Sequence, residues 1–225
     1  MSPHYTISVE NKRGMNTNYA FFMEPPQFTG DAQPWMNVWF TSYVPYNASF
    51  EISTGVDFYA WIGTVPTAPA PGVVVNSGMN LLANLGTTTG PGSTFDKTII
   101  DSFPTISEIS PTARPGSFEI DTGTGFSVPN NTYLLGLAKV NNRGQVAPVA
   151  SMAPGNNMKV QVAPKMKSFV SESHQIAGEI VDYSSTTRAG ATIDFTSGEG
   201  HGKLYARVVQ TTDGRFTVGY HDRFS

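Results

Sequence analysis

Apolar and polar residues alternate along most of this chain in short runs that end at glycine, proline or asparagine. The clearest run, SFEISTG at residues 49–55, returns as SFEIDTG at residues 117–123. When both copies are extended to Phe58 and Phe126, they agree at seven of ten positions. Alternation with a period of two is typical of a strand with one buried face, and a glycine that ends the run marks a turn or bulge. The repeat therefore predicts a recurring strand and corner.

A third, degraded copy of the run occupies residues 193–198 and keeps the order apolar, acidic, apolar, hydroxyl, glycine. Because side chains on a strand point alternately to its two faces, the apolar set should face a core. This set is Phe50, Ile52, Phe118, Ile120, Ile193 and Phe195. The acids between them should point away from the core, and they are Glu51, Glu119 and Asp194.

Three pairs of apolar runs predict hairpins, because each pair encloses turn residues such as Asn-Lys-Arg-Gly, Asn-Asn-Arg-Gly or Asp-Gly. Asp-Gly between alternating runs is the strongest of these signals. In chain order, the pairs are residues 5–9 with 18–23, residues 133–140 with 145–149, and residues 204–210 with 216–220.

Three other segments predict further elements, and a proline-rich range limits the strands in its part of the chain. Residues 35–40 are apolar on both faces, which is typical of a strand buried between two layers. Residues 175–183 predict another strand, and residues 80–85 predict one or two helical turns. Seven prolines between residues 64 and 116 argue against long central strands there and leave edge strands and ordered loops.

Short strands, frequent turns and related corners together predict an all-β fold, an antiparallel β-sandwich with internally repeated strand and corner motifs. A β-barrel is the alternative. Residues 1–225 form a single unit in the simplest interpretation. The other interpretation is two pseudo-repeated modules, residues 1–154 and 155–225, divided at the Pro-Gly-Asn-Asn cluster of residues 154–157.

Composition narrows the classes of function. Only 14% of the 225 residues are charged and the formal net charge is −3, so the chain has no basic surface for nucleic acid or an anionic membrane. The absence of cysteine excludes thiolate catalysis and thiolate metal sites, and it fits a reducing compartment. The N-terminus lacks the pattern of a signal peptide and no apolar run is as long as a membrane span, which favours a cytoplasmic protein. No cofactor is expected.

The histidines offer one candidate metal site. His201 and His221 could meet across the last predicted hairpin, each near an acid, Glu199 or Asp222. No histidine has the spacing of a known metal motif, so a surface or packing role is the alternative. The neighbouring GEGHGK segment lacks the Walker spacing and indicates a glycine-rich strand corner.

The acids of the repeat offer a candidate hydrolytic site. Glu51, Glu119 or Asp121 could act with a histidine if two carboxyl groups lay about 5 to 10 Å apart in a cleft. They could also bind Ca²⁺, which prefers oxygen ligands. The structural alternative is a solvated or salt-bridged strand face. The sequence therefore designates no catalytic residue.

Aromatic residues near turns offer a candidate ligand site. Tyr43, Tyr46, Tyr133 and Tyr220 lie near loops or strand ends, and Asp121 could add hydrogen bonds. An exposed aromatic ring beside polar groups is a suitable surface for stacking a sugar. The three tryptophans lie in the most apolar runs and should instead pack in the core.

The N-terminal segments YTISVEN, residues 5–11, and NYAFF, residues 18–22, resemble leaderless, cysteine-free fungal proteins of the abundant perithecial, or fruiting-body, type. The resemblance covers mainly the first 25 residues and includes no catalytic motif. It implies an abundant developmental β-sandwich protein without established enzymatic activity, and it transfers no functional residue.

Three functions are compatible with these features. In order of preference, they are a non-enzymatic, abundant β-sandwich protein with a structural, storage or developmental role, a lectin-like carbohydrate-binding module, and an acid-dependent hydrolase. The expected partners are a glycan or a second copy of the chain, and neither nucleic acid nor a membrane is expected.

Overall fold

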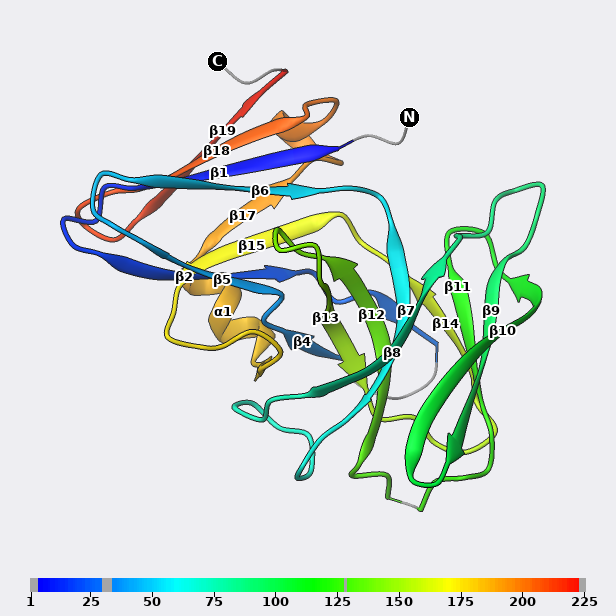
Figure 1. Ribbon diagram of the computed structural model, residues 1–225. Helices are drawn as coiled ribbons and strands as arrows, with labels where there is room; N and C mark the ends of the chain where they lie inside the picture. Colours follow the sequence, from blue (N-terminus) through cyan, green and yellow to red (C-terminus); the bar gives the residue numbers. More distant parts are fainter. Residues whose placement is uncertain (1–3, 30–33, 128, 223–225) are drawn as a thin grey trace.

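A computed structural model of the chain describes residues 4–29, 34–127 and 129–222 (Figure 1). Nearly all regular structure is β-strand, and the strands form four sheets that are largely antiparallel. The sheets pack in two pairs, and none of those in the described ranges closes on itself. The predicted all-β sandwich architecture is confirmed, and the barrel alternative is not formed.

The first sandwich lies at the left of Figure 1. One sheet has the order β19-β18-β1-β6, with β1 (Tyr5–Asn11), β6 (Ser49–Thr54), β18 (Tyr205–Gln210) and β19 (Phe216–His221). The facing sheet has the order β17-β15-β2-β5, with β2 (Thr17–Met23), β5 (Phe40–Val44), β15 (Lys167–Glu172) and β17 (Ala191–Asp194). Aromatic rings join the two sheets: the Phe50 ring lies 6.0 Å from that of Tyr19 and 5.5 Å from that of Phe21.

The second sandwich lies at the right of Figure 1. Its five-stranded sheet has the order β10-β9-β11-β14-β3, with β3 (Gln27–Phe28), β9 (Gly92–Ile100), β10 (Phe103–Ala113), β11 (Phe118–Thr122) and β14 (Lys159–Ala163). Its six-stranded sheet has the order β16-β4-β13-β12-β7-β8, with β4 (Trp35–Asn37), β7 (Phe58–Thr64), β8 (Asn76–Ala83), β12 (Tyr133–Val140), β13 (Val146–Met152) and β16 (Ile180–Val181).

The chain passes between the two sandwiches several times. It begins in the first sandwich, builds most of the second with β7 to β14, and returns to the first with β15. One cluster of buried apolar side chains contains residues of all four sheets, so the sandwiches share a core. The strands after residue 155 are divided between the two sandwiches, so the proposed modules 1–154 and 155–225 differ from the sandwiches. Whether those modules are separate units stays a prediction.

The three copies of the repeat lie in three different sheets, as strands β6, β11 and β17. Their apolar residues face the core as predicted: Ile52, Phe118, Ile120, Ile193 and Phe195 are buried, and half-buried Phe50 packs against the same core. Glu51 is exposed and Asp194 is half-buried.

Glu119 departs from the prediction for the acids, because it is only 4% exposed. The pairing of β10 with β9 shifts register between Ile109 and Ala113. The residues in that irregularity bring the Thr112 hydroxyl to 2.8 Å from Glu119 Oε1, and the Gln161 amide donates to Glu119 Oε2. The outer face of this sheet is therefore partly covered, which alternation alone could not reveal.

The predicted opening hairpin is wrong, although the other two hairpins are confirmed as β12 with β13 and β18 with β19. Strands β1 and β2 lie in facing sheets, and β1 pairs with β18 and β6. Asn11 explains the corner: its side-chain amide donates to the Met15 and Val44 carbonyls, 2.9 Å each, and its Oδ1 accepts from Arg13 N. These bonds turn the chain out of one sheet into the other.

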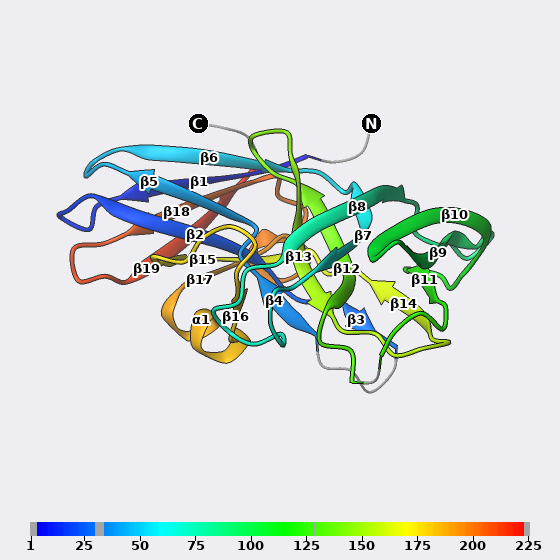
Figure 2. The ribbon, with the colours of Figure 1, turned by 60° about the horizontal axis from the view of Figure 1, so that its bottom comes forward.

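Three local predictions also fail. Residues 80–83 belong to strand β8 and residues 84–85 follow its end, so no helical turn forms there. Most of residues 175–183 are irregular, ending in short β16 and the start of helix α1 (Tyr183–Ala189). Helix α1 begins where Asp182 Oδ1 accepts from Ser185 N at 2.8 Å, and it lies beside β15 (Figure 2). The third failure is that a long inner strand does form between residues 64 and 116: β9 has nine residues, contains no proline and lies between β10 and β11. Pro104 and Pro111 lie on the edge strand β10.

The shared core predicts cooperative unfolding. Ile52 and Ile120 occupy equivalent positions of the repeat, one in each sandwich, and both are fully buried. Replacing either with alanine should cost about 2 to 5 kcal/mol through lost burial and a residual cavity. In urea unfolding followed by circular dichroism, each variant should shift one common transition to lower urea. Two separate transitions, with each variant shifting only its own, would contradict a shared core.

Candidate functional site

Two lysine side chains are buried in the second sandwich. Lys97, on β9, is 0% exposed, and Lys139, on β12, is 1% exposed. Lys97 leaves the same face of its strand as Phe95, which packs in the core between the sheets. A fully buried lysine is rare unless it is paired, because moving an ammonium group out of water is costly. Each of these two side chains therefore calls for a physical reason.

The Lys97 amine is surrounded by aromatic rings. Its Nζ lies 4.3 Å from the ring centroid of Phe126 and 5.3 Å from that of Tyr133, on the facing sheet. It has no hydrogen-bond partner among the residues that the structure describes. Burial without a counter-charge disfavours the ammonium form and lowers the pKa of Lys97 to about 7. Near neutral pH, this side chain is therefore divided between ammonium and free amine.

The Lys139 amine has a different environment. Its Nζ donates a hydrogen bond to the Gly55 carbonyl and lies 4.6 Å from the ring centroid of Phe58. Burial lowers the pKa of Lys139 to about 8, and the negative charge of Asp57 opposes this effect. Lys139 thus has both a hydrogen-bond acceptor and a favourable charge nearby, and Lys97 has neither.

The two phenylalanines that cover the lysines are the last residues of the two repeat copies. Phe58 ends the copy at residues 49–58, and Phe126 ends the copy at residues 117–126. Each copy therefore supplies a strand, a glycine corner and a ring that covers a buried amine from another strand. The copies differ at the residue before the ring, which is Asp57 in the first and Gly125 in the second.

A cavity of about 290 Å³ lies beside Lys97. Its lining consists of Lys97, Thr98, Ile99, Gly123, Thr124, Gly125 and Phe126. Asn156 holds Phe126 in place, because its Oδ1 accepts from Phe126 N and its Nδ2 donates to the Phe126 carbonyl, 3.0 Å each. Lys97 is the one ionisable residue in this lining, and its amine is buried beneath the Phe126 ring that forms part of the cavity wall.

Two further cavities were found in the described parts of the chain. One, of about 350 Å³, lies among residues of β13 and the segments near 75–77 and 177–178. The other, of about 260 Å³, lies between the ends of β7 and β8 and the β9–β10 turn. No aspartate, glutamate or histidine lines these two cavities or the cavity beside Lys97.

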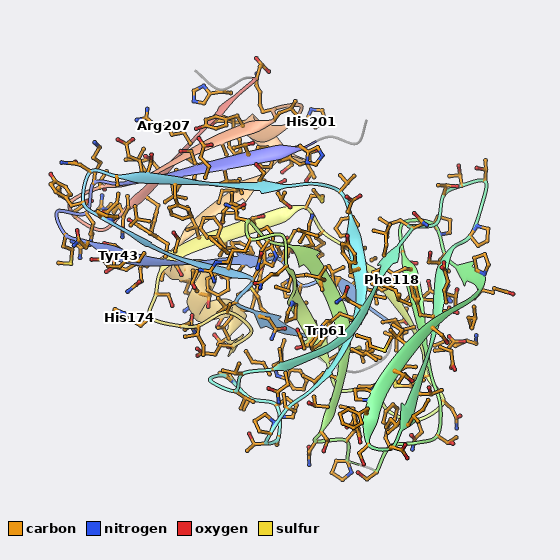
Figure 3. All side chains as sticks on the ribbon, in the orientation of Figure 1. Tyr43, Trp61, Phe118, His174, His201 and Arg207 are labelled. Atoms are coloured by element: carbon orange, nitrogen blue, oxygen red, sulfur yellow. The ribbon has the colours of Figure 1, made fainter. Side chains whose placement is uncertain are left out.

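The tyrosines predicted to bind a ligand are dispersed. Tyr43, on β5, is 60% exposed, and Tyr46, in the turn after it, is 46% exposed. Tyr220, on β19, accepts a hydrogen bond from Asp194 N at 2.9 Å. Tyr133 is the one that lies beside Lys97, in the other sandwich. Figure 3 shows Tyr43 well apart from His201 on the first sandwich.

Asp121, the remaining predicted ligand-binding residue, lies on the outer face of the five-stranded sheet. One carboxylate oxygen, Oδ2, is 2.8 Å from Lys159 Nζ, and the other, Oδ1, is buried without a hydrogen-bond partner among the described residues. Asp121 pairs with Asp96 across the strands, on the face opposite to Lys97. It therefore belongs to neither the Tyr43 surface nor the Lys97 cavity.

The residues of the candidate metal site lie near the last hairpin. Glu199 is in the short 3₁₀ helix Gly198–Gly200, and His201 follows it. His221 ends β19, and Asp222 pairs with Lys203 at 2.9 Å. Within the described ranges, no three His, Asp or Glu side chains form a group that could hold a metal ion. The glycine-rich segment forms a corner, in keeping with the structural interpretation of GEGHGK.

Neither lysine is among the site residues predicted from the sequence, although a signal for both was present. Lys139 is the single charge in the apolar strand segment LLGLAKV, and Lys97 lies beside Asp96 in the segment TFDKTII. A charge on the inward-facing phase of such a run indicates either a buried lysine or a bulge, and only the fold separates the two. The link between each lysine and its phenylalanine depends on strand pairing, which cannot be read from one sequence.

The two lysines predict opposite effects on stability. Lys97→Met replaces an unpartnered buried amine with an apolar chain of similar length, so it should raise the free energy of unfolding at pH 7 by about 1 to 3 kcal/mol. Lys139→Met removes the donor to the Gly55 carbonyl and should lower this free energy by about 1 kcal/mol. Urea unfolding of both variants measures the difference. If Lys97→Met destabilised the protein as much as Lys139→Met, Lys97 would have a structural role.

The advantage of Lys97→Met should also depend on pH. Between pH 7 and 10.5, the unfolded chain keeps the proton on Lys97 and the folded chain loses it. The wild-type protein therefore gains stability as pH rises through this window, by at most about 1.4 kcal/mol per pH unit from this group. The variant lacks the titrating amine, so its advantage should be largest at pH 7 and below and should shrink towards pH 9. A constant difference from pH 7 to 9 would show that the Lys97 pKa is normal.

Comparison with known proteins gives one match. No curated protein and no solved structure is significantly similar to the chain. The N-terminal resemblance to fungal perithecial proteins receives no support from these comparisons. Among the described residues, no helix is long and apolar enough to cross a membrane. A family model, described as RhiA, matches residues 2–221. This match covers nearly the whole sequence, and the chain therefore belongs to the RhiA family.

Proposed function

We propose that this protein is a non-enzymatic β-sandwich protein with a structural or storage role. One observation carries the proposal: none of the three described cavities is lined by a carboxylate or a histidine. Acid-dependent hydrolysis needs two carboxyl groups that face each other across a substrate site. The acids of the repeat instead lie on strand faces in three different sheets.

The bonding of these acids supports the same proposal. Glu119 accepts hydrogen bonds from Thr112 and Gln161 and lies 3.6 Å from Lys159. Asp194 accepts from the Thr196 amide and hydroxyl and from the Ser197 hydroxyl, at 2.6 to 2.8 Å. Carboxylates that are engaged in this way stabilise turns and sheet faces.

A developmental role, high abundance and a cytoplasmic location are parts of the same proposal. They rest on the N-terminal resemblance to fungal perithecial proteins and on the absence of cysteine. Self-association is the expected partnership. Quantitative mass spectrometry of source cells, with fractionation, tests these parts together: a scarce protein, or one recovered outside the cytoplasm, would contradict them.

The proposal predicts no turnover by the repeat acids. Wild-type protein, Glu119→Gln and Asp121→Asn should each hydrolyse a panel of chromogenic glycosides and esters no faster than buffer alone. Glu51→Gln, at the exposed equivalent of Glu119, tests the remaining candidate acid. Hydrolysis by the wild-type protein that drops a hundredfold or more in any of these three variants would overturn the proposal.

A carbohydrate-binding role is the second candidate, because Tyr43 and Tyr46 expose their rings close together along the chain. This role predicts hits for the wild-type protein in a glycan array. The double variant Tyr43→Ala/Tyr46→Ala should bind those glycans about tenfold more weakly or worse, because stacking on the rings is lost. Tyr183→Ala, at a tyrosine that is 41% exposed on α1, should leave binding unchanged. An array without hits would remove this candidate.

A further inference from the structure

Lys97 stands out because the repeat provides a natural comparison within the same chain. Both Lys97 and Lys139 are buried beneath the phenylalanine that ends a repeat copy. Lys139 has a carbonyl acceptor and the nearby charge of Asp57. Lys97 has no acceptor, and Gly125 occupies the position that corresponds to Asp57. The second copy therefore covers an amine with a ring but gives its charge no hydrogen-bond acceptor and no counter-charge.

The surroundings favour a neutral amine over a site for an anion. A lysine that binds anions must stay protonated, and fixed acceptors or a neighbouring acid maintain that state. The titratable group facing Lys97 from the opposite sheet is Tyr133, whereas Asp96 and Asp121 leave the outer face of their own sheet. A desolvated lysine in an apolar pocket is a nucleophile in covalent catalysis.

We propose that Lys97 is a covalent binding site for small aldehydes, which enter the cavity of about 290 Å³ beside it and form an imine with its amine. This inference goes beyond the structural role proposed above, because it assigns capture of a ligand without turnover. The cavity suits an aldehyde with a short apolar tail, since Ile99 and Phe126 supply apolar lining.

The chemistry needs no additional reagent. The lone pair of the neutral amine attacks the carbonyl carbon, and proton transfer gives a carbinolamine. Loss of water then breaks the carbon–oxygen bond: the oxygen leaves with two hydrogens that came from the amine, and a carbon–nitrogen double bond forms. The reaction is reversible, so excess water releases the aldehyde and restores the amine.

Access to the amine depends on Phe126, because Lys97 is fully buried beneath this ring. The two hydrogen bonds from Asn156 fix the backbone of Phe126, and the preceding Gly123-Thr124-Gly125 segment lines the cavity. An aldehyde in the cavity must therefore displace the Phe126 ring to reach the amine. Asn156→Ala, which frees the Phe126 backbone, should speed capture without changing the residue modified.

The main experiment traps the imine. Full-length protein is incubated at pH 7 with butanal and cyanoborohydride, and adducts are counted by intact mass and located by peptide mapping. Because burial lowers the pKa of Lys97 to about 7, a far larger share of this amine is neutral at pH 7 than of a surface lysine with an ordinary pKa. Burial slows access, so we expect Lys97 to be modified about tenfold faster, or more, than any surface lysine. The adduct that peptide mapping locates at Lys97 should be absent in Lys97→Met, in which the α-amino group can still react.

Gly125 provides the matched variants. A side chain at this position would meet Ile99 at ordinary contact distances, 3.6 to 3.9 Å, so substitution fits the space. Gly125→Asp recreates the Asp57 arrangement, restores charge to the Lys97 amine and should reduce capture at pH 7 at least tenfold. Gly125→Asn has nearly the same size without the charge and should capture at close to the wild-type rate. The reduction in Gly125→Asp should fade as pH rises towards 10.

Two results would overturn the inference. One is modification of Lys97 at pH 7 no faster than that of surface lysines in folded wild-type protein, both with and without Asn156→Ala. The other is equal loss of capture in Gly125→Asp and Gly125→Asn, which would show that size and not charge controls the site. Circular dichroism of each variant confirms that the fold is retained. Modification of Lys139 in preference to Lys97 would also reject the assignment.

Discussion

The cost of placing two amines inside a β-sandwich is the constraint that links both copies of the repeat to the strands that they cover. Burial disfavours the charged form of a lysine. At both lysines, the ring of a phenylalanine at the end of a repeated strand and corner covers the amine and attracts its positive charge. The strands before that ring fill the core with Ile52 in one sandwich and with Phe118 and Ile120 in the other. In each repeat copy, the strand that packs in the core and the phenylalanine that covers the lysine therefore belong to one continuous segment.

The two repeat copies give the lysines that they cover different surroundings. In the first copy, Gly55 and Asp57 support the charge of Lys139, at the point where the chain leaves the first sandwich for the second. In the second copy, Gly125 replaces the acid, and a cavity lies where a charged side chain would have stood. A repeated motif can stabilise the charge of a buried lysine in one copy and lack the groups that do so in the other. This difference is the basis for the proposed ligand site at Lys97, where the sequence contains no catalytic motif.

Alternation of side chains predicted the all-β class, the sandwich and the inward-facing residues of the repeat, because these features depend on neighbours along the chain. Alternation could not predict features that depend on strands far apart in the sequence. Asn11 sends β2 into the facing sheet through bonds to Met15 and Val44, and a register shift in β10 covers Glu119. The candidate site was missed for the same reason, since Lys97 meets Phe126 and Tyr133 only after folding.

The parallel pairing of β1 with β18 has a consequence for the order in which the chain folds. Thr6 lies opposite Tyr205 in this pairing, so the first strand of the sequence gains this partner only after one of the last strands has been synthesised. Strands β7 to β14 follow each other along the chain and can assemble as soon as they are made, whereas the first sandwich stays open until β15 and β17 to β19 emerge. During synthesis, β1 and β2 can pair with β6 and β5 but leave their other edges unpaired, which makes them the segments most dependent on protection from aggregation.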